Sequence, residues 1–243
     1  MANGFDPRVT ATARPTTVGT GTAVDAGLRK YMLSVYNYMT SGVLLTGIVA
    51  LLFAQSGMAA QILLGPGILK YVIMFAPLAF VMVLSFGVHR LSTGTAQLLY
   101  WAFAVVMGLS LSSIFLVFTG QSIATTFFAT AAAFAGLSLW GYTTKKDLSG
   151  WGTFLLMGVI GLIVAMLINL FVQSTAMQLA ISFIGVLLFA GLTAYDTQRI
   201  KSLYFQVAGS DMLGKTAILG ALSLYLDFVN MFTFLLQFMG QRD

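Results

Sequence analysis

The chain lacks several residue types on which catalytic centres depend. It has no cysteine, so it can form neither a disulfide framework nor a thiolate metal site. Its one histidine, His89, cannot build a zinc site alone. Glutamate is absent, all seven acidic residues are aspartate, and no serine lies in a Gly-x-Ser-x-Gly elbow. We therefore expect a protein that is not an enzyme and that carries no cofactor.

Charge is scarce as well. Only 8% of the residues are charged and 58% are hydrophobic, whereas a typical soluble domain carries about 25% charged residues. So little charge cannot solvate a globular surface, which predicts an integral membrane protein whose main partner is the lipid bilayer. The net charge of +5 does not indicate a nucleic-acid partner, because the basic residues stand singly or in pairs between apolar runs.

Long apolar runs are abundant. A hydrocarbon core of ~30 Å needs about 20 apolar helical residues, and seven runs meet this length. The sequence therefore predicts an all-α membrane protein of seven transmembrane helices, without a convincing internal repeat. The predicted spans are Tyr31–Phe53, Ile68–Val88, Gln97–Phe118, Ile123–Tyr142, Trp151–Phe171, Met177–Gln198 and Leu213–Phe238.

The basic residues predict the orientation of these spans. Lysine and arginine collect in cytoplasmic segments. With seven spans and a cytoplasmic N-terminus, only Lys70 and Arg242 fall outside. An even number of spans, or a re-entrant last segment, would move only Arg242. The residues that fall inside are Arg8, Arg14, Arg29, Lys30, Arg90, Lys145, Lys146, Arg199, Lys201 and Lys215.

The first 28 residues differ from the rest of the chain. They are rich in Ala, Thr and Gly and have no apolar stretch, so they do not form a cleavable signal peptide. We expect residues 1–28 to be a disordered cytoplasmic tail and residues 29–243 to form a seven-helix transmembrane domain.

Two aspartates, Asp196 and Asp227, interrupt the apolar runs. An ionisable residue inside a membrane is costly and is by default a candidate for function. Helical spacing places Thr193 on the face of Asp196, and it places Ser223 and Asn230 on the face of Asp227. If the two carboxylates meet in a desolvated site, both cannot ionise at low cost, so the pair titrates as a unit and senses pH without histidine.

Structural interpretations of the two aspartates stay open. Asp227 could be a buried carboxyl group that bonds to Asn230 or to a tyrosine. Asp196 could lie at the interface in water, because Arg199 follows it closely. Asp227 lies 12 residues past Lys215, or ~18 Å along a helix. The two carboxylates therefore meet only if the sixth transmembrane helix continues through Arg199 towards Tyr204.

The remaining charged and polar groups allow two further hypotheses. Arg90 ends the second span on the side of Asp196 and could latch that carboxylate, or it could be an ordinary anchor in the headgroup region. His89 is expected to be interfacial.

A tight calcium site needs six to eight oxygen ligands, so Asp196 and Asp227, with Thr193, Ser223 and Asn230, could bind calcium only weakly and transiently. An intramembrane aspartyl protease has a Tyr-Asp pair and a Gly-x-Gly-Asp loop. Tyr195 and Asp196 match the pair, but the loop motif is missing before Asp227.

Two segments resemble a known family. Ala190 to Gln198 (AGLTAYDTQ) is similar to the signature of the Bax inhibitor-1 family, also called the transmembrane Bax inhibitor motif family. Gly220 to Phe232, with its LYLDFVN core, is similar to the last helix of that family. The resemblance covers the chain after about residue 28 and is strongest with the bacterial members, which implies a bacterial inner (plasma) membrane protein.

The resemblance implies properties that composition cannot show. It implies six helices packed around a central seventh and a pH-sensitive calcium leak, with calcium ions and protons as partners. It assigns the pH sensor to Asp196 and Asp227 and the latch to Arg90. Family members are also linked to suppression of cell death and to modulation of a membrane protease. Two alternatives stay open, a proton-coupled transporter of small solutes and a non-catalytic regulator of a membrane protease.

Overall fold

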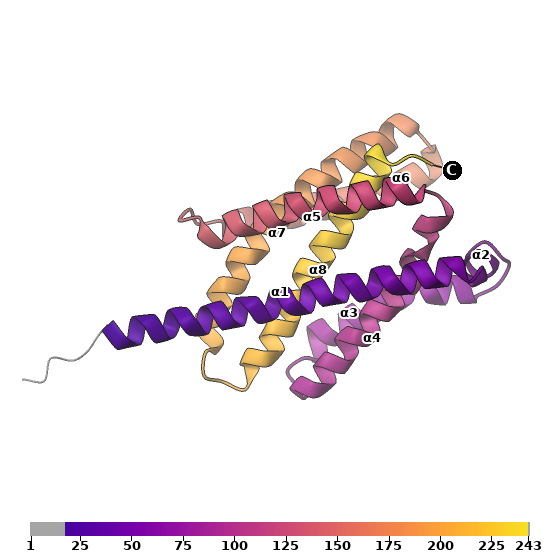
Figure 1. Ribbon diagram of the computed structural model, residues 1–243. Coiled ribbons are helices and arrows are strands. Elements are labelled where there is room, and N and C mark those ends of the chain that lie inside the picture. The colour runs from indigo at the N-terminus through magenta and orange to yellow at the C-terminus, as the bar shows by residue number, and fades with distance from the viewer. Residues whose placement is uncertain (1–17, 243) are drawn as a thin grey trace, which may run out of the picture.

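The computed structural model describes residues 18–242, with side chains described from residue 25 onward (Figure 1). In this part of the chain the secondary structure is helical. The elements are α1 (Val18–Gln55), α2 (Met58–Leu63), α3 (Leu69–Gly87), α4 (Thr93–Leu111), the 3-10 helix η1 (Ser112–Leu116), α5 (Gly120–Thr143), α6 (Trp151–Val172), α7 (Thr175–Val207) and α8 (Met212–Met239).

Seven helical segments are long and apolar enough to cross a membrane, and each coincides with a predicted span. Side-chain caps explain several of the starting points. Ser92, Thr119 and Ser174 each accept a hydrogen bond from a backbone N–H three residues later, at 3.1, 3.2 and 3.3 Å. Such caps satisfy N–H groups that would otherwise lack partners at a helix start. The prediction of an all-α membrane protein with seven transmembrane helices is confirmed.

The first helix begins earlier than the sequence predicts. Residues 1–17 lie outside the described part of the chain, but α1 starts at Val18, inside the segment expected to be a disordered tail. Leu28 and Tyr31 are buried, and the Tyr31 ring lies 5.5 Å from that of Tyr204 on α7. A Cβ at Gly27 would collide with the Tyr204 hydroxyl. Packing against α7 therefore reaches Gly27, inside the segment that composition predicts to be a tail.

Helix α8 occupies the centre of the bundle, as the family resemblance implies. In its most apolar stretch 61% of the residues are buried, whereas the other spans range from 11% to 28%. Helices α1, α3 and α4 pack together on one side of α8, and α5, α6 and α7 on the other (Figure 1). Helix α6 joins the bundle mainly through α7. The two groups meet directly where α1 contacts α7, but α1 and α5 do not pack against each other over any length.

The two ends of the bundle differ in charge. We call the end at which α1 enters the bundle and α8 begins the basic end, and the other the opposite end. Among the described residues, the opposite end holds Lys70 and Arg242, and the other basic residues lie at the basic end. The chain crosses seven times without a re-entrant last segment, because α8 is one continuous helix. The C-terminal residues therefore lie at the opposite end.

The C-terminal residues are attached to the link between η1 and α5. The Thr119 N–H donates to the Gln241 carbonyl at 3.1 Å, and the Gln241 N–H donates to Ser122 Oγ at 3.0 Å. Phe118 and Arg242 form an isolated antiparallel bridge. The residues that follow the central helix are thus held by one backbone hydrogen bond and by one hydrogen bond to the Ser122 hydroxyl.

Candidate functional site

The two transmembrane aspartates lie on the closely packed pair α7 and α8. Helix α7 continues unbroken to Val207, which is the condition that the sequence sets for the carboxylates to meet. At one level of this antiparallel pair, Phe189 stacks on Phe234 with ring centres 5.8 Å apart. At another, a Cβ on Gly220 would lie 3.1 Å from Ile200. Interpolation between these contacts puts Asp227 level with Ala194 and Tyr195 of α7.

Asp196 therefore lies less than half a helical turn nearer the basic end than Asp227, a step of ~2 Å along α7. Asp196 is the charged side chain that neighbours Asp227 where α7 packs on α8. The structure thus brings together the two carboxyl groups that the sequence predicts as a pair.

The carboxyl group of Asp227 is enclosed by protein. The residue is 5% exposed, and its Oδ2 atom is buried without a hydrogen-bond partner among the residues that the structure describes. Most buried polar atoms in proteins do have such a partner. The sequence allows a structural role in which Asn230 holds this carboxyl group, but the Asn230 amide donates to the Leu226 carbonyl at 2.8 Å. A structural hydrogen bond from Asn230 to Oδ2 therefore does not account for the buried carboxyl group of Asp227.

Asp196 is half-buried and has a cation beside it. Arg199, one turn further along α7, is the basic residue whose charge acts on Asp196. Arg90, the predicted latch, is exposed in the turn that follows α3, and α3 packs mainly on α4. His89 precedes it and is exposed as well. In this structure the charge next to Asp196 therefore belongs to Arg199.

The supporting polar residues bond within their own helices. Thr193 is fully buried and its Oγ1 donates to the Phe189 carbonyl at 2.8 Å. Ser223, one turn before Asp227 on α8, is half-buried. No cluster of three or more His, Cys, Asp or Glu side chains occurs within residues 18–242. Carboxylate ligands for calcium in this site are thus limited to Asp196 and Asp227.

A chain of hydroxyl groups lies near the site, and the sequence does not predict this chain. Tyr36 Oη lies 2.6 Å from Ser138 Oγ, which lies 2.9 Å from Thr197 Oγ1. Thr197 in turn donates to the Thr193 carbonyl at 2.7 Å. The chain crosses from α1 through α5 to α7 and ends at Thr197, the residue that follows Asp196 in the sequence. The four-residue spacing of Thr193 and Thr197 is visible in the sequence, but their partners on α1 and α5 are not.

The segment Ala190 to Gln198 also has a packing role. A Cβ on Gly141 of α5 would lie 2.9 Å from Cα of Ala194, so these two helices approach backbone to backbone. In lipid, small residues permit such close approach. Gln198 accepts from the Leu148 N–H and donates to the Lys146 carbonyl, both at 2.8 Å. The segment thus binds α5 and the loop between α5 and α6 while it presents Asp196.

Comparison with known proteins identifies the family of this chain. A family model described as inhibitor of apoptosis-promoting Bax1 matches residues 28–243. The chain belongs to the Bax inhibitor-1 family. It is 46% identical to the inner membrane protein YbhL of Escherichia coli K12 over 219 residues, which are 89% of this chain and 94% of that protein.

Other bacterial relatives are equally similar. RP147 of Rickettsia prowazekii is 45% identical over 228 residues, covering 93% of this chain and 96% of that protein. A protein of Caulobacter vibrioides is 48% identical over 229 residues, or 90% and 91% of the two chains. The family resemblance that the two sequence segments indicate is confirmed, and the protein is an integral membrane protein.

Proposed function

We propose that this Bax inhibitor-1 family protein is a pH-sensitive calcium leak, with Asp196 and Asp227 as the proton sensor and as part of the ion path. We place it in the bacterial inner membrane with a cytoplasmic N-terminus. The name of the YbhL relative and the collection of basic residues at one end of the bundle support this placement.

The observation that carries the proposal is the unpartnered, buried Oδ2 of Asp227 beside a second carboxyl group. Two neighbouring carboxylates in a desolvated site are costly to ionise together. A proton or a cation between them removes that cost, so protons and calcium compete for one site. Because the carboxyl group is enclosed, passage of an ion requires a conformational change that acid would favour.

Arg90 enters the proposal as a latch on Asp196. It is exposed at the end of α3 in this structure, and Arg199 is the cation beside Asp196. The proposed latched state therefore differs from the structure by a movement of the end of α3 towards α7. Protonation of Asp196 would remove the charge that Arg90 binds and release α3.

The test is calcium flux from liposomes that contain the purified protein, between pH 5 and pH 8. We expect a flux that rises as the pH falls, and we expect Asp227→Asn to abolish this dependence. The matched control is Asp147→Asn, in the exposed loop between α5 and α6, which should leave the pH profile unchanged.

Flux through Asp227→Asn that follows the wild-type pH profile would refute the sensor. Saturable, proton-coupled uptake of a solute would favour the transporter alternative. Liposomes that leak no more than empty ones at any pH would favour the non-catalytic regulator of a membrane protease.

A further inference from the structure

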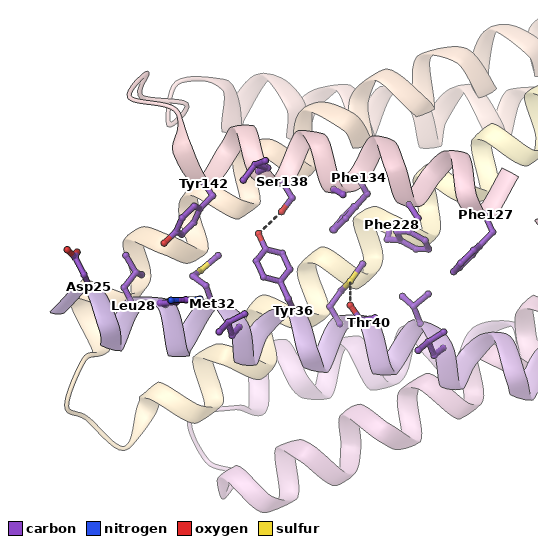
Figure 2. Close-up of a pocket in the computed structure, with 18 residues that line it drawn as sticks. Asp25, Leu28, Met32, Tyr36, Thr40, Phe127, Phe134, Ser138, Tyr142 and Phe228 are labelled. Atoms are coloured by element: carbon purple, nitrogen blue, oxygen red, sulfur yellow. Dashed lines mark hydrogen bonds between the residues drawn. The ribbon is translucent and has the colours of Figure 1, made fainter. Parts of the chain in front are cut away.

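A long groove separates α1 from α5 on the surface of the bundle that faces the lipid. Its volume is about 930 Å³, and it is lined by α1 from Asp25 to Leu44 and by α5 from Phe127 to Tyr142 (Figure 2). Along α5 this distance is ~22 Å, more than half of a ~30 Å hydrocarbon core. The groove exists because α1 and α5 pack on α8 without close packing of their backbones on each other, and the Tyr36 hydroxyl reaches Ser138 across it (Figure 2).

The lining of the groove is apolar over most of its length. Met32 and Met39 come from α1, Phe134 from α5, and Phe228 of α8 lies at its base. Leu33 and Leu139 lie at its edge and are exposed, at 52% and 64%. Methionine side chains adapt to irregular partners. Since the groove lies between two membrane-spanning helices, it opens to the hydrocarbon of the bilayer, and an acyl chain matches its chemistry.

One end of the groove is polar. Asp25 and Arg29 both line it, and they are four residues apart on α1 and therefore neighbours on one helix face. Tyr142 lines the same end from α5 (Figure 2). Tyrosine is enriched at the depth of the lipid headgroups. The lining of this end thus includes one cation and one anion, with the Lys201 ammonium 4.8 Å from the Tyr142 ring, at the depth where a phospholipid carries its phosphate.

We propose that the groove binds a phosphatidylethanolamine molecule, with one acyl chain between α1 and α5. The phosphate accepts from the Arg29 guanidinium, and the ammonium group donates to the Asp25 carboxylate. Arg29 is suited to phosphate because its guanidinium donates paired hydrogen bonds. Asp25 disfavours a lipid with a net negative charge, because that headgroup has no ammonium to offset the repulsion. This site is separate from the carboxyl pair and does not depend on the proposed leak.

The test is native mass spectrometry of the purified full-length protein, titrated with phosphatidylethanolamine or phosphatidylglycerol of the same acyl chains. We expect phosphatidylethanolamine to bind at least about tenfold more tightly, the size of effect that one charge-assisted hydrogen bond supplies. Arg29→Gln should weaken its binding by about tenfold. Asp25→Asn should remove the preference between the two lipids. Lys30→Gln, on the adjacent exposed residue, is the matched control and should bind as the wild type does.

A second pair of variants tests the groove itself. Ala135→Phe fills it, whereas Ala132→Phe adds the same ring at an exposed position of α5 that does not line it. We expect only Ala135→Phe to lose the lipid, with an unchanged thermal unfolding transition. Leu139→Trp, at the exposed edge, replaces Ala135→Phe if that variant does not fold. Equal lipid binding by the groove variant and Ala132→Phe, or equal binding of the two lipids by the wild type, would overturn the proposal.

Discussion

The hydroxyl of Tyr225 on α8 lies 2.7 Å from Oγ1 of Thr46 on α1. Both residues are buried, and Thr46 also donates to the Ala104 carbonyl of α4 at 2.8 Å. Two residues after Tyr225 the central helix carries Asp227. The position of this carboxyl group is therefore set from α1 and α4 as well as from α7, and the hydrogen bonds that set it have measurable energies.

Removal of the Thr46 hydroxyl should destabilise the bundle. Thr46→Val deprives both the Tyr225 hydroxyl and the Ala104 carbonyl of a buried partner, so we expect a loss of about 1–2 kcal/mol in the free energy of unfolding. The measurement is equilibrium unfolding in mixed micelles with increasing dodecyl sulfate. Thr125→Val, at an exposed position of α5, is the control. A loss of the same size in both variants would contradict the role of the buried bonds.

The contact between α7 and α8 should be equally sensitive to a single methyl group. A Cβ on Gly185 would lie 2.6 Å from the ring of Phe234, so Gly185→Ala forces the two helices apart and should cost about 1–3 kcal/mol. On α6, a Cβ on Gly161 meets no atom within 4 Å. Gly161→Ala should therefore stabilise its helix by up to ~1 kcal/mol through helix propensity. The same unfolding measurement distinguishes the two, because the expected effects have opposite signs.

Substitution of two arginines can distinguish two roles. Arg199 tests the effect of a neighbouring charge on Asp196, and Arg90 tests the proposed latch. A cation favours the ionised form of a neighbouring carboxyl group, so its removal allows protonation at higher pH. In liposomes, Arg199→Gln should shift the pH at half-maximal calcium flux upward. Arg90→Gln should instead raise the flux at neutral pH, because it removes the proposed latch altogether. A profile for Arg90→Gln that superimposes on the wild type would remove Arg90 from the mechanism.

Asp147 supplies a pH reference outside the membrane spans. The Ser149 hydroxyl and the Ser149 backbone N–H, at 2.9 Å, lower the pKa of the Asp147 carboxyl group below its ordinary value of about 3.9. A lowered pKa contributes stability above that ordinary value, and the contribution is lost as the pH falls through the folded value. Asp147 therefore stays ionised from pH 5 to pH 8, which is why Asp147→Asn controls the flux experiment.

Carbon-13 NMR of labelled aspartate measures this shift directly, with seven aspartates and no glutamate to assign. Ser149→Ala should raise the Asp147 pKa towards its ordinary value. An Asp147 carboxyl group that titrates at the same pH in both proteins would show that the hydroxyl does not bind it.

The spans follow from the sequence because hydrophobic length is a local property. Each predicted run overlaps a helix of the structure, such as Trp151–Phe171 against Trp151–Val172, although α7 continues nine residues past the predicted end at Gln198. The start of α1 does not follow in this way. Gly27 and Tyr31 of this helix pack against Tyr204, which is distant in the sequence. The composition of residues 1–28 therefore predicts disorder, whereas the residues from Val18 onward are helical in the structure.

Part of the candidate site can likewise be recognised in the sequence, and part of it only in the fold. Asp196 and Asp227 are visible in the sequence because charge in an apolar run has few explanations. Ser138 and Tyr36 are ordinary residues in the sequence, and only the fold places them in one hydroxyl chain with Thr197. The groove is likewise invisible in the sequence, since it depends on two helices that fail to pack on each other.

The hydrogen bonds between Gln241 and the link before α5 make the C-terminal end of α8 a fulcrum. A helix of 28 residues is ~42 Å long, and a tilt of about 5° about that point moves its far end by ~4 Å. Asp227 lies ~18 Å from the fulcrum and moves by less than about 2 Å. A small displacement of the basic end of α8 thus reaches Asp227 at less than half its amplitude. Movements of the loops at that end therefore shift the carboxyl group by a distance on the scale of a hydrogen bond.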